Sequence, residues 1–179
     1  MASNHGGDFA LTLDELRVVA RYAAGCAQEA LPIFEAERPD DPRPRSAIDA
    51  AKVFARGAPR SNLQRVAALE AHRAAKETTN AAAQAAARAA GDAAASAYLH
   101  PLPIASQGGH ILRAAAFTAR ALELHSGGDQ DAATRAVDRA RRRASPVLID
   151  VLQRYPPAPL GKNRVDQLLR LLDTQLRAE

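Results

Sequence analysis

Residues 81–97 read AAAQAAARAAGDAAASA, and this stretch decides the fold. Alanine has the highest intrinsic helix propensity because its side chain loses no entropy in a helix. A helix of this length would be a rod of roughly 25 Å. Its short side chains let neighbours approach closely, so we expect it at the centre of a bundle, between the helices before and after it. Gly91 costs about 1 kcal/mol of helix propensity relative to alanine, which predicts a close backbone crossing at that residue.

Helices are predicted on both sides of this stretch, and no segment has the alternating pattern of a strand. Thr12 and Glu15 form a capping box that begins the first helix, and Pro32 is expected to kink or end it. Later helices are expected over residues 43–56, 61–76, 106–125, 129–143 and 163–179. Residues 129–154 fit either two helices or one helix kinked at Pro146. The sequence therefore predicts an all-α antiparallel bundle of about seven or eight helices.

The length of 179 residues suits one domain with a sizeable core. We expect a disordered tail over residues 1–10 and a single helical domain over residues 11–179, in which residues 129–179 pack as a C-terminal extension. Alanine supplies 43 residues and aromatic residues only 4%, so the core must be built from Ala, Leu and Val. A leucine stripe in the last helix could dock on the bundle or pair two copies in a homodimer. The stripe consists of Leu168, Leu169, Leu172 and Leu176.

Enzyme and metal-site motifs are absent from the sequence. It contains no phosphate-binding GxxxxGK[ST] loop, no GxSxG nucleophile turn and no GxGxxG fingerprint. Cys26 lies on an apolar helix face and is interpreted as a small core residue. The helical histidines lack the spacing of metal ligands; they are His72, His100, His110 and His125. We therefore expect a protein without enzymatic activity, without a bound metal and without a cofactor.

The cellular location is predicted from the cysteine content and the hydropathy. A single cysteine fits a reducing compartment, and residues 1–10 lack the apolar segment of a secretion signal. No stretch of about 18 residues is apolar enough to span a membrane. We therefore expect a cytoplasmic protein with no membrane partner.

The first candidate site is a junction of opposite charges. Residues 1–41 hold eight acidic residues and three arginines, a net charge of −5, whereas the whole chain carries +4. Glu35, Asp40 and Asp41 are followed directly by Arg43 and Arg45. The junction predicts either a surface of separated charge that binds a partner protein or a helix end with ordinary ion pairs.

The second candidate is a basic cluster of four arginines, which could contact nucleic acid phosphates. The cluster consists of Arg139, Arg141, Arg142 and Arg143. No aromatic residue alternates with them, as a single-strand site would require. A solvated helix C-terminus, where cations are favoured, is the preferred explanation. Nucleic acid binding is therefore the alternative function and the less favoured one.

Two segments carry a family resemblance. Residues 31–57 read LPIFEAERPDDPRPRSAIDAAKVFARG, and residues 86–101 read AARAAGDAAASAYLHP, followed by GHILRAAAFTARALEL. The shared pattern is an acidic connector, an Arg-Pro-Arg triplet, an Ala-Ile helix start and an aromatic residue near a glycine stop. Here it is carried by Phe34-Glu35, Asp41, Arg43-Pro44-Arg45, Ala47-Ile48, Phe54 and Gly57. His72 and Gly91 also fall where residues of the family are expected. Over residues 12–125 the chain resembles the Imm-5-like immunity proteins, which are small all-helical bacterial proteins.

The resemblance implies a non-enzymatic protein that binds and neutralises a toxin. On that basis the partner surface is placed at the connector, with Glu35, Asp40, Asp41, Arg43 and Arg45 as its residues. Immunity proteins that block nucleases are often acidic and mimic the substrate. This chain is basic overall, with a pI of about 9.7, so such mimicry would have to use residues 29–41 alone.

Overall fold

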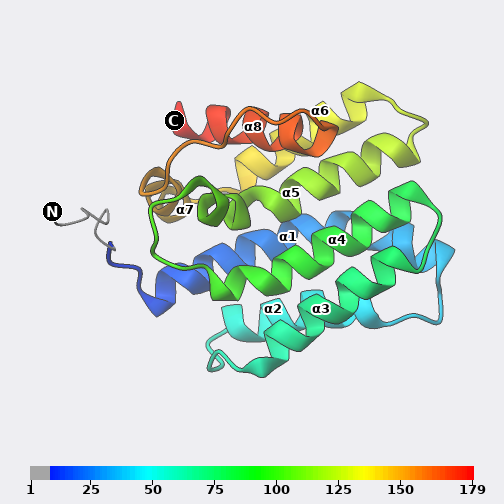
Figure 1. The fold of residues 1–179 in the computed structure, drawn as a ribbon, viewed down its shortest axis with the longest axis horizontal. Coiled ribbons are helices and arrows are strands. Elements are labelled where there is room, and N and C mark those ends of the chain that lie inside the picture. The colour runs from blue at the N-terminus through cyan, green and yellow to red at the C-terminus, as the bar shows by residue number, and fades with distance from the viewer. Residues whose placement is uncertain (1–8) are drawn as a thin grey trace, which may run out of the picture.

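The computed structural model describes residues 9–179, which form eight α-helices, one short 3-10 helix and no strand (Figure 1). The elements are α1 (Leu13–Glu37), α2 (Arg43–Ala55), α3 (Asn62–Lys76), α4 (Ala81–Ala95), η1 (Ser96–Tyr98), α5 (Ala105–His125), α6 (Gln130–Arg143), α7 (Pro146–Gln153) and α8 (Arg164–Arg177). The predicted all-α bundle is confirmed. Most of the tail predicted over residues 1–10 lies outside the described residues. Phe9, which is described, packs edge-to-face against Tyr155 with ring centroids 4.8 Å apart.

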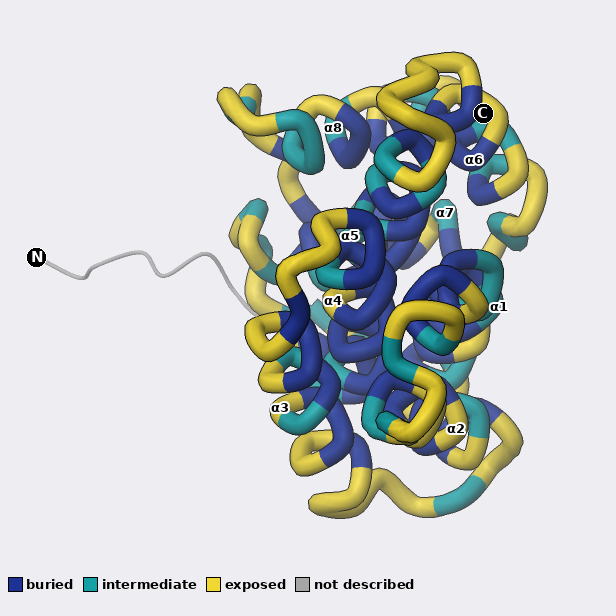
Figure 2. The backbone as a smooth tube through the Cα atoms, turned by 90° about the vertical axis from the view of Figure 1, so that its right-hand side faces the viewer, coloured by how far each residue is buried: buried dark blue, intermediate teal, exposed yellow. Residues whose placement is uncertain are grey.

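The alanine helix α4 is at the centre of the bundle. It packs against α1, α2, α3 and α5, and most of its residues are buried (Figure 2). Ala86, Ala89 and Ala93 have no exposed surface. Because an alanine side chain ends at Cβ, several helices can pack closely around the same helix. The prediction of a central helix flanked by α3 and α5 is confirmed.

The larger apolar side chains form a second part of the core, beside α4. Ile111 and Leu112 of α5 are buried together with Leu148 of α7 and with residues of α1, α6 and α8. The leucine stripe of α8 belongs to this cluster, since all four of its side chains are buried within the chain. The stripe therefore docks on the bundle, and it is not the surface of a homodimer.

Pro32 does not end α1, which continues to Glu37, so the prediction of a helix end there is wrong. Proline removes one backbone hydrogen bond and crowds the preceding turn. However, Pro32 is exposed, whereas its neighbours Leu31, Ile33 and Phe34 are buried. Burial of these three side chains holds the helix together across the missing bond.

The predicted backbone crossing at Gly91 is also wrong, because a side chain occupies that space. A Cβ atom placed on Gly91 would lie 2.7 Å from Nε2 of His72, and its three nearest atoms would all belong to the imidazole ring rather than to a backbone. The glycine therefore makes room for an imidazole that reaches over from α3. The packing partner of this position is His72.

Most helix ends follow the local sequence, but the N-caps of α2 and α5 provide no side-chain hydrogen bond. Both side chains of the Thr12 capping box form their bonds, and Ser145 caps α7 through Leu148 N–H. Ala144 is extended between α6 and α7, so of the two alternatives for residues 129–154 the structure has two helices. The helix expected to begin at Ser106 begins at Ala105, and its N-cap, Ile104, provides no side-chain bond.

Candidate functional site

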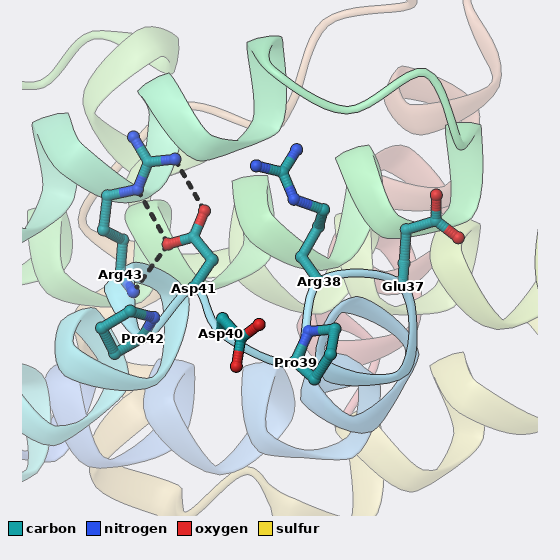
Figure 3. A pocket seen from close by; sticks show the side chains of 7 residues that line it. All are labelled: Glu37, Arg38, Pro39, Asp40, Asp41, Pro42 and Arg43. Atoms are coloured by element: carbon teal, nitrogen blue, oxygen red, sulfur yellow. Dashed lines mark hydrogen bonds and ion pairs between the residues drawn. The ribbon is translucent and has the colours of Figure 1, made fainter.

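The connector between α1 and α2 lines a surface hollow of about 430 Å³. Its lining residues run without a break from Glu37 to Arg43 (Figure 3). The amide of Asp41 donates to the carbonyl of Arg38 at 3.1 Å, which closes a turn. Nη1 of Arg38 donates to the backbone carbonyl of Glu77 at 2.9 Å. The connector is thus fixed both within itself and to the end of α3.

Arg43 joins the connector to α3 by two ion pairs. Its Nε and Nη2 atoms donate to the two oxygens of Asp41 at 2.8 and 2.6 Å, and Nη2 also lies 2.5 Å from Oε2 of Glu77 (Figure 3 shows the Asp41 contacts). Hydrogen bonds from Arg43 lower the pKa of Asp41 and that of Glu77. The same bonds raise the pKa of Arg43. Such paired guanidinium–carboxylate contacts fix both charge and geometry.

Arg45 and Glu35 form a second bidentate pair, between α2 and α1. The nitrogen–oxygen distances are 2.6 and 2.9 Å. Hydrogen bonding by Glu35 raises the pKa of Arg45. Asp40 is exposed, and within residues 9–179 it has no hydrogen bond or ion pair. The structure thus pairs Glu35 with Arg45, and Asp41 with Arg43, and leaves Asp40 open to solvent. Of the five predicted residues, only Asp40, Asp41 and Arg43 line the hollow.

The arginine cluster at the end of α6 is largely engaged in ion pairs. Arg139 and Arg143 both bind Glu29 of α1, at 2.8 and 2.7 Å. Arg141 binds Glu179 at 2.9 Å. Arg142 is exposed and has no such partner within the described part of the chain. These carboxylates neutralise much of the positive charge that would be needed to bind nucleic acid phosphates.

Cys26 is buried in the core, as the sequence indicated. Burial raises the pKa of its thiol to about 12. The thiolate, which is the nucleophilic form, is therefore scarce near neutral pH. Across residues 9–179, no cluster of three or more His, Cys, Asp and Glu side chains has the arrangement of a metal site. Within the same residues, no helix is both long and apolar enough to cross a lipid bilayer.

A second group of polar side chains, which the sequence did not predict as a site, lies between α3, α4 and α5. Asp92 is buried in α4, and its Oδ2 atom has no hydrogen-bond partner among residues 9–179. Burial raises the pKa of this carboxyl to about 7. A perturbed carboxyl in a hollow is a common feature of functional sites. The signal available in the sequence was Gly91-Asp92, two poor helix formers in the middle of the alanine helix.

Comparisons with known proteins agree with this helical architecture. Residues 10–145 match the family model described as Imm-5 like putative immunity protein. The match includes α6, which the resemblance did not cover, and leaves α7 and α8 outside. No curated protein and no solved structure matches the chain. The matched segment is well over half of the sequence, and the chain therefore belongs to the Imm-5 like putative immunity protein family.

Proposed function

We propose that this protein is a non-enzymatic binding protein that neutralises a toxin by holding it on the connector between α1 and α2. The observation that carries the proposal is the family match over residues 10–145. An immunity protein acts by binding, so the proposal requires a surface with a fixed shape rather than a catalytic centre. The connector is the best candidate for that surface.

The rigidity of the connector supports this choice. Pro39, Pro42 and Pro44 restrict the backbone, and Arg43 ties the segment to Asp41 and Glu77. A surface that is already ordered loses little conformational entropy when a partner binds. The hollow of about 430 Å³ along the connector can accept a protruding side chain of the partner.

The open carboxylate at the connector indicates the charge of the partner. Asp40 is exposed and unpaired within residues 9–179. In the same part of the chain the carboxylate of Glu37 accepts one hydrogen bond, a long one of 3.4 Å from Nδ2 of Asn80. Both carboxylates line the hollow. We expect a basic patch of the toxin to bind there, since complementary charges speed association and select the partner.

Survival of cells that produce a candidate toxin tests the proposal. Co-production of the wild-type chain should restore growth. Asp40→Arg should reduce that protection, because it places a cation against the basic patch. Asp131→Arg makes the same charge change at an exposed position of α6 that does not line the hollow, and it should protect as well as wild type. A folded wild-type chain that gives no protection would contradict the proposed function.

A further inference from the structure

A second hollow lies on the face shared by α3, α4 and α5, away from the connector. Its volume is about 310 Å³. It is lined by His72, Lys76, Arg88, Asp92, Arg113 and Phe117. The size is at the lower end of the range for small-molecule sites. The lining is unusual in having three permanent cations around one buried carboxyl.

The carboxyl of Asp92 lacks a partner. The residue has 6% of its surface exposed, and its Oδ2 atom forms no hydrogen bond with any residue that the structure describes. Its Oδ1 atom lies 3.6 Å from Nε2 of His72, which is too far for a good hydrogen bond. Buried polar atoms in native proteins are nearly always bonded, and an unbonded one calls for an explanation. A bound ligand that donates a hydrogen bond to Asp92 is such an explanation.

The cations of this hollow also lack anionic partners. Within residues 9–179, neither Lys76 nor Arg88 nor Arg113 forms a hydrogen bond or an ion pair with another side chain, whereas many arginines elsewhere are paired. The guanidinium of Arg88 lies over the ring of Phe117, 5.8 Å from its centroid, which helps to hold it in place. Unpaired guanidinium groups are strong ligands for phosphate and carboxylate.

Two glycines clear space for this arrangement. A Cβ on Gly91 would lie 2.7 Å from Nε2 of His72, and a Cβ on Gly109 would lie 3.2 Å from Nη2 of Arg113. Both glycines are inside helices, where glycine is unfavourable. Residues that lower local helix stability but make room for polar side chains are typical of functional sites.

We propose that this hollow binds a small oxyanion, with Arg88 and Arg113 holding its phosphate or carboxylate group and Asp92 accepting a hydrogen bond from a hydroxyl of the same ligand. The adjoining hollow of about 510 Å³ shares Arg88, Arg113 and Phe117 with it. It gives room for the remainder of a larger ligand. The site does not depend on the toxin partner, because it lies on helices other than those that carry the connector.

Titration of the purified protein with inorganic phosphate and with sulfate tests this site. The imidazole NMR signals of His72 report binding, in a phosphate-free buffer near pH 8, where the carboxyl of Asp92 is ionised because its pKa is about 7. Phosphate carries an O–H donor there, whereas sulfate carries none. We expect saturable phosphate binding with a Kd of about 1 mM or lower, and sulfate binding that is at least about tenfold weaker.

Variants then assign the binding to the named residues. Arg88→Ala and Arg113→Ala remove side chains that are not buried, so the fold is retained, and each should abolish saturable phosphate binding. Asp92→Asn should reduce the preference for phosphate over sulfate. Arg142→Ala, the matched control, removes an exposed and unpaired arginine of α6 and should bind phosphate as wild type does. Absence of saturable binding, equal binding of sulfate, or wild-type binding by Arg88→Ala would overturn the proposal.

Discussion

Asp92 and His72 face each other across α4 and α3 with 3.6 Å between Oδ1 and Nε2, and they do not form a conventional ion pair. Burial raises the pKa of Asp92 to about 7. Burial, reinforced by Arg88 and Arg113, lowers the pKa of His72. Both shifts favour the neutral form of the side chain. Near neutral pH the carboxyl of Asp92 is therefore close to the midpoint of its titration, whereas the imidazole of His72 favours its neutral form.

Asp92→Asn should stabilise the protein above neutral pH. In the unfolded chain this carboxyl ionises near its ordinary pKa, whereas in the folded chain it stays protonated up to about pH 7. Between these values the folded state binds more protons than the unfolded state, so the stability of wild type falls as pH rises from about 4 to 7. At higher pH the variant should exceed wild type in free energy of unfolding by a few kcal/mol, on the order of 3.

Urea denaturation of both proteins between about pH 4 and 8 measures this difference. The gain should grow with pH and vanish at the acidic end. Asp49→Asn changes an exposed carboxylate of α2 and should show no comparable trend. A gain that does not depend on pH would show that the carboxyl of Asp92 ionises as easily in the folded as in the unfolded state.

Gly91→Ala should move the imidazole of His72 without unfolding the protein. The added Cβ would lie 2.7 Å from Nε2 and push the ring toward solvent. Because burial is the main cause of the lowered pKa of His72, that pKa should rise toward its ordinary value in an NMR titration. The helix propensity gained, about 1 kcal/mol, offsets the packing that His72 loses.

A double-mutant cycle with His72→Ala separates these two effects. In the His72→Ala background, Gly91→Ala should give the full gain of about 1 kcal/mol in the free energy of unfolding. A loss of several kcal/mol in that background would mean that the backbone, rather than the imidazole, closes off the space above Gly91.

Features of the fold that depend on nearby residues could be predicted from the sequence. The capping box of Thr12 and Glu15 is complete within four residues, and the helix propensity of α4 is a property of its own alanines. The effect of Pro32 could not be predicted, since it depends on which neighbouring side chains the rest of the chain buries. The occupant of the space at Gly91 likewise depends on which faces of α3 and α4 meet.

The candidate sites show the same limit. The sequence placed Asp41 and Arg43 close together, but not Glu77, which is 34 residues beyond Arg43 and completes their ion pairs. The sequence offered His72 as a residue without metal-ligand spacing and as a position that matches the family, but it offered no partner for its side chain. Its position beside Asp92 results from how α3 and α4 are aligned along each other, which the sequence alone does not determine. Ion pairs among the connector charges were one of the two alternatives that the sequence left open, whereas the particular partner of each charge could not be predicted.

Glu123→Gln should destabilise the contact between α5 and α8. Glu123 is buried and accepts hydrogen bonds from Arg120 and from Arg164, at 2.7 Å in each case. Burial raises the pKa of this carboxyl, but the two arginines outweigh that effect and lower it overall. The stabilisation is therefore present above the unfolded pKa of about 4 and is lost as pH falls through the lower folded value.

The expected loss in Glu123→Gln near neutral pH is about 1–3 kcal/mol, because the arginines are partly exposed and the full cost of a broken buried pair is not reached. Glu70→Gln breaks an exposed pair with Arg73 on α3 and should cost less than about 0.5 kcal/mol. Equal losses in chemical denaturation would show that the Glu123 cluster contributes no more than an ordinary surface pair.

Cys26 should resist thiol reagents in the folded protein. The side chain has 2% of its surface exposed, and burial raises the pKa of the thiol to about 12. At mildly alkaline pH, the absorbance assay with a disulfide reagent should detect a thiol only after denaturant is added. Rapid reaction of the native protein would instead place Cys26 on an accessible surface.

The affinity of the purified protein for its proposed toxin partner is the most direct test of the proposed function and of its surface. Calorimetry should show tight binding by wild type and a loss of at least about tenfold in Asp41→Ala/Arg43→Ala, which removes the ion pair that orders the connector. Glu70→Ala/Arg73→Ala removes an exposed ion pair of α3 and should bind as wild type does. Unchanged binding by a folded Asp41→Ala/Arg43→Ala protein would contradict the connector surface, and no binding by wild type would contradict toxin neutralisation itself.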